Sequence, residues 1–156
     1  MCTFINSKKL LILLFMLNLI SLTGCSKNTT QIDWKDDNLK IEIKVNNYTL
    51  TATLINSTSS KTLLEYLKVS DLVVETSDYG NFEKVGQLPF NLPKNDSIIT
   101  AKPGDIILYQ GDSICFYYET NTWSFTKLGG IDNVCNFNLK DIYGNGNTRF
   151  YISMIK

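Results

Sequence analysis

The chain has 156 residues, 15 of them basic and 15 acidic, and it contains no histidine. Its balanced charge and scattered Lys and Arg residues argue against a nucleic-acid surface, which needs a basic excess or a clustered basic stripe. The absence of histidine removes the Ser/His and Cys/His nucleophilic pairs and nearly every zinc or iron site that uses imidazole. We therefore expect no metal site and no cofactor, and we assign no catalytic residue.

Residues 1–24 are typical of a secretory signal peptide. Lys8 and Lys9 precede an apolar run over 10–22, and small or polar residues follow it. The run is about a dozen residues long, short of the roughly 17 to 25 that a membrane-spanning helix needs. A permanent transmembrane anchor is therefore the weaker interpretation.

The sequence Leu22-Thr23-Gly24-Cys25 resembles the lipobox of bacterial lipoproteins. A lipobox places two small residues before a cysteine whose sulfur is acylated before the peptidase cuts. We predict lipidation at Cys25 and a flexible tether over 25–38. Two acyl chains hold a protein stably on a bilayer, so the expected location is the bacterial cell envelope, on the extracytoplasmic side of a membrane.

The remaining segment, 39–156, begins with a predicted hairpin and a helix. Apolar and polar residues alternate over 39–54, with Asn46 and Asn47 between two half-buried strands. Hydroxyl side chains at 57–60 then provide helix N-caps. Leu63, Leu64 and Leu67 follow at a spacing that places them on one side of a short helix.

Short strands dominate the rest of the chain. A strand is predicted over 69–75, and a long irregular segment over 76–102, where Gly, Pro and Asn repeatedly break any period. Further strands are predicted over 105–109, 113–119, 123–128 and 149–155, with helical turns within 134–143. One helix among seven or eight strands predicts a mainly β protein with a closed or nearly closed barrel.

Two cysteines of the predicted domain could form a disulfide. Cys115 and Cys135 lie 20 positions apart, and a disulfide between them is permitted outside the cytoplasm. The alternative is two buried thiols that act as small hydrophobic side chains, and it is the interpretation we favour.

The acidic residues give little indication of catalysis. Asp71, Glu75 and Asp78 have strand spacing and are expected on a solvated face. Asp105 follows Pro103 and Gly104, where a carboxylate typically caps a turn by accepting hydrogen bonds from nearby backbone.

Aromatic residues crowd the middle of the chain. In the strand over 113–119, Phe116 and Tyr118 share one face, while Cys115 and Tyr117 share the other. A barrel needs one of these sets as core. The other set is available for an outer groove, although aromatic side chains more often pack in cores.

Several motifs in order resemble the bacterial cyclophilin-like proteins over roughly 39–155. The motifs are Asp78-Tyr79-Gly80, Lys84-Val85-Gly86, Leu88-Pro89-Phe90, the stretch 102–109 (KPGDIILY) and the stretch 126–131 (TKLGGI). The resemblance implies an eight-stranded, mostly antiparallel barrel with one or two helices.

The resemblance also raises peptidyl-prolyl isomerisation. In a true cyclophilin an arginine polarises the prolyl amide beside a phenylalanine-rich pocket, with a histidine and a tryptophan nearby. This chain departs from that pattern, since it lacks histidine and its only arginine, Arg149, precedes the last strand. Lys84 or Lys127 would have to replace the arginine, without its planar guanidinium group.

Two functions follow as competing hypotheses. The first is a lipid-anchored binding module whose groove holds a peptide or small ligand, with Tyr79, Lys84, Tyr109, Trp123 and Lys127 as candidate groove residues. The second is a divergent prolyl isomerase that assists the folding of secreted proteins. Fold alone does not decide between them.

Overall fold

The computed structural model describes residues 39–155. The predicted signal peptide, the lipidation site Cys25 and the tether over 25–38 lie outside the described residues. Within 39–155, none of the helices has the length and apolar character needed to cross a membrane.

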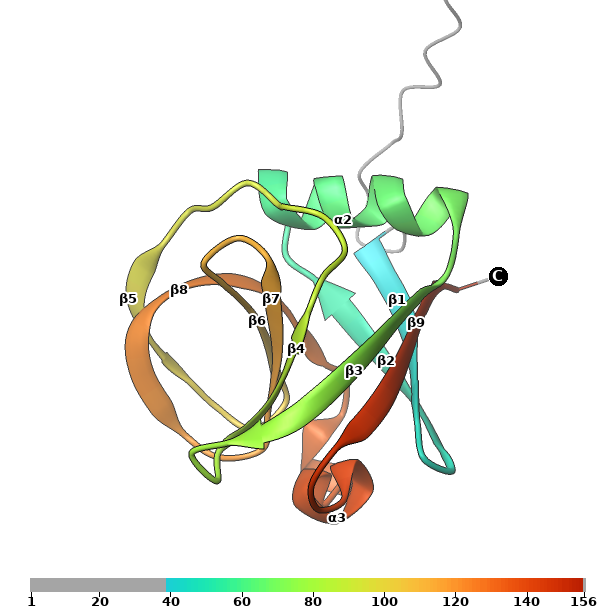
Figure 1. Ribbon diagram of the computed structural model, residues 1–156, viewed down its shortest axis with the longest axis vertical. Helices are drawn as coiled ribbons and strands as arrows, with labels where there is room; N and C mark the ends of the chain where they lie inside the picture. Colours follow the sequence, from blue (N-terminus) through green and yellow to red (C-terminus); the bar gives the residue numbers. More distant parts are fainter. Residues whose placement is uncertain (1–38, 156) are drawn as a thin grey trace, which may run out of the picture. The chain divides into compact units, whose positions relative to one another are not determined.

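Strands make up about half of this part of the chain (Figure 1). In chain order the elements are β1 Lys40–Val45, β2 Tyr48–Leu54, α2 Thr58–Val69, β3 Leu72–Tyr79, β4 Glu83–Gln87, β5 Ser97–Ala101, β6 Asp105–Tyr109, β7 Ser113–Tyr117, β8 Asn121–Ile131, the 3₁₀ helix η3 Val134–Asn136, α3 Leu139–Tyr143 and β9 Thr148–Met154. The alternation over 39–54 forms the expected β1–β2 hairpin. Asn46 makes its turn with a φ of 51°.

Eight antiparallel strands close into a ring. Their order is β2-β1-β9-β3-β4-β7-β6-β8, and β2 pairs with β8 to complete the circle. This confirms the predicted mainly β fold with a closed eight-stranded sheet. The one strand outside the ring is β5, which pairs only with the first half of β8.

The main hydrophobic core fills the interior of the ring. Leu63, Leu64 and Leu67 of α2 are buried in it, as their spacing predicted. Ser57 caps α2, because its side chain accepts a hydrogen bond from the Ser60 backbone N–H at 3.2 Å. Helix α2 lies across one end of the ring, and α3 lies at the other (Figure 1).

A second, smaller cluster lies on the outer face of the ring. We call β5 together with residues 121–125 of β8 the β5–β8 arm; it curves around one side of the molecule (Figure 1). The outer cluster consists of Ala101, Ile107, Cys115, Tyr117 and Phe125. Cys115 and Tyr117 therefore face away from Phe116 and Tyr118, which belong to the main core. The predicted division of this strand into two faces is confirmed.

The prediction of an irregular segment over 76–102 is wrong for about half of these residues, which form strands. Strand β3 continues to Tyr79, and the segment also contains β4 and β5. The glycines in this segment do not mark a loop. Gly80 lies in a turn, and Gly86 lies where β4 passes close to β3, since a Cβ on Gly86 would lie 2.5 Å from the Glu75 carbonyl oxygen. The predicted start of β3 was also early, because Val69 ends α2.

Candidate functional site

A pocket of about 540 Å³ opens between the β3–β4 turn and the β5–β8 arm. It is lined by Tyr79, Gly80, Phe82, Glu83, Tyr109, Asn121, Trp123 and Phe125, and we call it the aromatic pocket. Its volume falls in the range of about 300 to 1,000 Å³ that is typical of small-molecule sites.

Contacts between rings hold the walls of the aromatic pocket in place. Phe82 meets Tyr79 edge-on at 5.9 Å between centroids, and it stacks on Tyr117 at 5.9 Å. Phe125 meets Tyr117 at 5.9 Å and Tyr109 at 6.2 Å, both edge-on. These contacts join the five rings into one connected set. Aromatic pairs at such separations add stabilisation to that which comes from their buried area.

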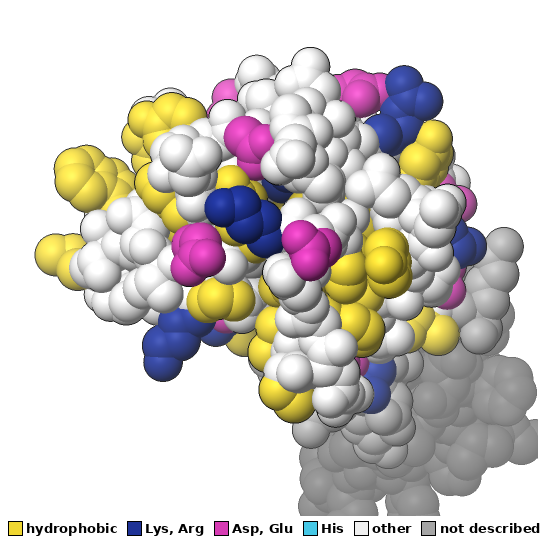
Figure 2. All heavy atoms as spheres, turned by 90° about the horizontal axis from the view of Figure 1, so that it is seen from below, with side chains coloured by type: hydrophobic (Ala, Val, Ile, Leu, Met, Phe, Trp, Pro, Cys, Tyr) yellow, Lys and Arg dark blue, Asp and Glu magenta, His cyan; other side chains and the backbone are white. Residues whose placement is uncertain are grey.

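Two large aromatic side chains stand exposed at the pocket. Tyr79 is 62% exposed and Trp123 is 61% exposed. Figure 2 shows hydrophobic side chains projecting on the side where β5 and β8 lie in Figure 1. Exposed aromatic residues beside an apolar hollow are the usual form of a binding surface.

The β3–β4 turn shapes one wall of the pocket. Gly80 and Asn81 both have a φ of +59°, and the Phe82 N–H donates to the Tyr79 carbonyl oxygen at 3.2 Å. A Cβ on Gly80 would lie 2.1 Å from Cε1 of Phe82. The Phe82 ring can lie over the turn only because residue 80 has no side chain.

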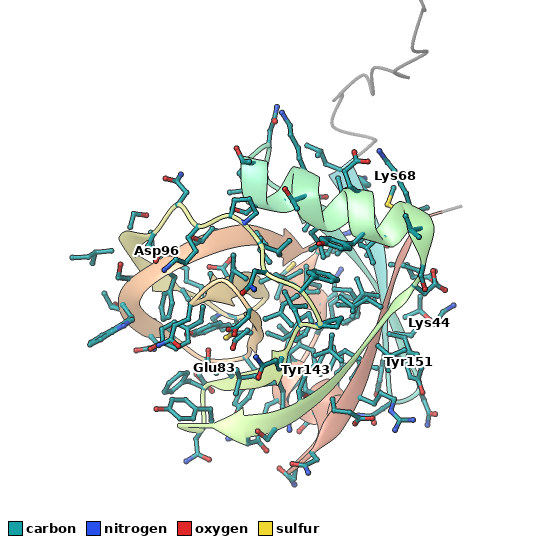
Figure 3. All side chains as sticks on the ribbon, turned by 45° about the horizontal axis from the view of Figure 1, so that its top comes forward. Lys44, Lys68, Glu83, Asp96, Tyr143 and Tyr151 are labelled. Atoms are coloured by element: carbon teal, nitrogen blue, oxygen red, sulfur yellow. The ribbon has the colours of Figure 1, made fainter. Side chains whose placement is uncertain are left out.

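Glu83 is the one acidic or basic side chain that lines the aromatic pocket. It is only 7% exposed, and its Oε2 atom has no hydrogen-bond partner. Its register partner across β4 and β7 is Tyr117, with Cys115 one pleat further on the same face. Figure 3 shows Glu83 among aromatic side chains close to the β3–β4 turn. A buried carboxyl oxygen without a partner in the protein is costly, so it is a candidate to contact a bound molecule.

Burial raises the pKa of the Glu83 carboxyl above its usual value. Hydrogen bonding from the Tyr117 hydroxyl and the Cys115 thiol offsets only part of this effect. The same burial, together with Glu83, raises the pKa of the Tyr117 hydroxyl and of the Cys115 thiol. At neutral pH Tyr117 and Cys115 are therefore neutral donors toward this carboxyl.

The structure brings together three of the five candidate groove residues. Tyr79, Tyr109 and Trp123 line the aromatic pocket. Lys84 and Lys127 do not line it, so the prediction that they share one groove with the three aromatic residues is wrong.

Lys84 lies on the opposite face of β4 from Glu83. Its side chain is fully buried inside the ring, with Nζ 2.9 Å from Asp78 Oδ2 and 2.7 Å from the Gly146 carbonyl oxygen. Asp78 also accepts hydrogen bonds from the Tyr118 hydroxyl and the Gly146 N–H. Burial works against the charged form of Asp78, but these bonds outweigh it and lower its pKa. Asp78 is itself exposed, as predicted for a solvated face, although its carboxylate also reaches the buried Lys84.

Lys127 belongs to a different hollow. Its Nζ lies 2.7 Å from Asp105 Oδ1, and both residues line a pocket of about 280 Å³ between the start of α2 and β5. Asp105 Oδ2 also accepts a hydrogen bond from the Lys102 N–H at 3.1 Å, which confirms its predicted role in the turn. Arg149 pairs with Glu75 on the outside of β9 and β3.

Cys115 and Cys135, the two cysteines among residues 39–155, are both free thiols. Cys115 is buried in the outer cluster, as the favoured interpretation predicted, whereas Cys135 is exposed beside η3. The disulfide alternative does not describe this arrangement, and the expected burial of Cys135 is wrong. Among residues 39–155, no three acidic or cysteine side chains lie in a group that could hold a metal ion.

Sequence reasoning missed Glu83 altogether. Phe82 and Phe125 belong to the aromatic residues that crowd the middle of the chain, but Glu83 and Asn121 carried no signal. The surroundings of Glu83 come from strands distant in sequence, since Tyr117 of β7 is its register partner and the β5–β8 arm supplies other residues of the pocket lining. A pattern of neighbouring residues does not report such a contact.

A closed antiparallel β-barrel with an aromatic pocket on its outer side defines the class of this protein. The model of the cyclophilin-like family matches residues 43–151. The chain belongs to the cyclophilin-like family, as its motifs had suggested.

Among solved structures, the barrel is similar to the solution structure of a hypothetical protein from Archaeoglobus fulgidus. The two share 12% sequence identity with a TM-score of 0.57, over 80% of this chain and 100% of the other. At this identity the likeness concerns the fold. No curated protein matches the chain.

Proposed function

We propose that this protein is a lipid-anchored extracytoplasmic binding module whose ligand occupies the aromatic pocket. The observation that carries the proposal is the pairing of two exposed aromatic residues, Tyr79 and Trp123, with a hollow of small-molecule size. Apolar walls with a few polar groups are the usual composition of ligand sites. Here Glu83 and Asn121 supply the polar groups.

The pocket can be tested with a neutral aromatic probe, 2-phenylethanol. The chain has two tryptophans, so Trp34→Phe leaves Trp123 as the fluorescent reporter at the pocket. We expect a saturable change in Trp123 fluorescence. Tyr79→Ala or Phe82→Ala should weaken the binding several-fold by removing a wall.

Tyr48→Ala is the matched control. Tyr48 is 48% exposed on β2 and does not line the pocket, so its removal should leave probe binding unchanged. A non-saturable signal, or equal effects of Tyr79→Ala and Tyr48→Ala, would count against the binding function.

The lipid anchor rests on the lipobox and is tested separately. Cells grown with an alkyne-tagged fatty acid should incorporate the label into the chain, and Cys25→Ser should abolish it. Cys2→Ser is the control, because Cys2 lies outside the lipobox. Label retained in Cys25→Ser would overturn the anchor.

The isomerase alternative has less support at this pocket. None of the eight residues that line it is Lys or Arg, so the cationic donor of a true cyclophilin has no counterpart there. A proline-peptide isomerisation assay on the full chain is expected to show no rate above the spontaneous one. A catalysed rate that falls on Phe82→Ala would restore the alternative.

A further inference from the structure

The charge of Glu83 has no compensating group in the aromatic pocket. The basic residue next to it in sequence, Lys84, points into the ring and pairs with Asp78. The polar neighbours of the Glu83 carboxyl, Tyr117 and Cys115, both have a raised pKa and carry no positive charge. Burial works against the charged form of Glu83, so a cation that enters the pocket from outside the protein would stabilise that form.

The walls of the pocket suit an organic cation in particular. The faces of Trp and Tyr rings attract ammonium groups within about 6 Å, and this attraction grows when the site excludes water. Tyr79, Phe82, Tyr109, Trp123 and Phe125 surround the pocket above Glu83. A hard metal ion would need about six oxygen ligands, whereas one carboxyl is present.

Other ligand chemistries fit less well. An anion would face the Glu83 carboxylate without a basic partner, and like charges repel in a buried site. A purely apolar ligand would cover Glu83 and leave Oε2 unpaired, which carries a desolvation cost. An ammonium group on an apolar body satisfies both the carboxylate and the rings.

Resting on the proposed binding function, we propose that the aromatic pocket binds a small organic amine. Its ammonium group contacts the Glu83 carboxylate, and its apolar part packs against the surrounding aromatic rings. The volume of about 540 Å³ admits a compound of this kind.

Three probes with the same phenyl ring test the proposal: phenethylammonium, 2-phenylethanol and 3-phenylpropionate. They carry a positive, a neutral and a negative group. Each is titrated at neutral pH into the full chain carrying Trp34→Phe, with Trp123 fluorescence as the readout. We expect phenethylammonium to bind about tenfold more tightly than 2-phenylethanol, and 3-phenylpropionate to bind most weakly.

Variants of Glu83 assign this preference to its charge. Glu83→Gln should weaken phenethylammonium binding about tenfold and 2-phenylethanol binding much less, because only the ammonium group loses a counter-charge. The control, Glu65→Gln, removes one negative charge from α2, which supplies no residue to the pocket, and should change neither affinity.

The outcomes separate this proposal from the binding function on which it rests. If 2-phenylethanol binds as tightly as phenethylammonium and Glu83→Gln alters neither, the amine assignment fails while the pocket remains a ligand site. If none of the three probes binds, both fail. A fourth probe, N-acetyl-lysine methylamide, presents an ammonium group as a peptide would. Tighter binding of this probe than of phenethylammonium would overturn the small-amine assignment in favour of a peptide lysine.

Discussion

Glu83 and Lys84 are neighbours in β4, yet their side chains lie on opposite faces of the strand in unlike surroundings. Lys84 Nζ lies 2.9 Å from Asp78 Oδ2 inside the ring, while Glu83 Oε2 has no partner beneath the aromatic pocket. Successive residues of a strand alternate between faces, so the two charges cannot pair with each other. One charge is therefore satisfied by the fold, and the other is left for a ligand.

The raised pKa of Glu83 predicts that this residue costs stability at neutral pH. The folded protein holds the Glu83 proton to a higher pH than the unfolded chain, so the Glu83 contribution to stability declines as pH rises from about 4.5 through the raised pKa. Each unit of elevation corresponds to about 1.4 kcal/mol. Glu83→Gln should therefore raise the melting temperature at pH 7 and lose this advantage in acid.

Thermal unfolding of the two proteins between about pH 4 and pH 8 checks this expectation. Glu65→Gln serves as the charge-matched control, because Glu65 lies on the exposed side of α2 and forms a surface pair with Lys68. An advantage of Glu83→Gln that is the same at every pH would show that its cause is not the ionisation of Glu83.

The pair between the fully buried Lys84 and the partly exposed Asp78 predicts how substitutions of the two residues change stability. Asp78→Asn leaves a fully buried lysine with the Gly146 carbonyl oxygen but without a counter-charge, which typically costs about 3 to 5 kcal/mol. Lys84→Met should cost less, and Asp78→Asn together with Lys84→Met should be more stable than Asp78→Asn alone. Urea denaturation of the three variants measures these differences.

The lowered pKa of Asp78 predicts that the stabilisation from its pair with Lys84 is lost at low pH. The stability that the ionised carboxylate contributes is present above the ordinary Asp pKa of 3.8 and is lost as pH falls through the lowered folded value. In Lys84→Met that loss should shrink. Additive costs of the two substitutions would show that the pair is not coupled in solution.

The position of Gly80 against the Phe82 ring predicts that its substitution affects ligand binding as well as stability, whereas substitution of a control glycine affects stability alone. Gly80→Ala places a Cβ at a φ of +59° and against Cε1 of Phe82. The control, Gly146→Ala, has a φ of +69° with nothing within 4 Å. Both should lose about 1 to 2 kcal/mol from the left-handed backbone. Only Gly80→Ala should weaken binding of 2-phenylethanol, because the Phe82 ring must move; equal affinities of the two variants would contradict this role of Gly80.

The fold was predictable where neighbouring residues carry the pattern. Strict alternation over 39–54 predicted β1 and β2, and three leucines at helical spacing predicted α2. Strand β4 was not predictable in this way, because its pairing with β7 joins residues about 30 positions apart and because Gly80 before it and Gly86 within it resemble turn residues.

The site shows the same division. Tyr79, Tyr109 and Trp123 were identifiable as aromatic candidates, and the ring brings them together. The prediction that Lys84 lines the groove failed because the sequence does not show which face of β4 turns inward, and a shift of one residue exchanges the two faces. Glu83 shares its face with Tyr117 and Cys115 of β7, which belong to the outer cluster together with residues of the β5–β8 arm, and no local pattern reports this arrangement.

The two free thiols predict a sharp difference in reactivity. Cys135 is exposed, whereas Cys115 is 1% exposed and burial raises the pKa of its thiol. Because the thiolate is the reactive form, iodoacetamide should modify Cys135 in the native protein and Cys115 only after unfolding. Mass mapping of the peptides distinguishes the two sites from Cys2 and Cys25. Cys135→Ser should change stability by less than about 0.5 kcal/mol, and Cys115→Ser should destabilise the outer cluster by more. Protection of both thiols until a reductant is added would instead demonstrate a disulfide between them, which would require η3 and β7 to approach each other.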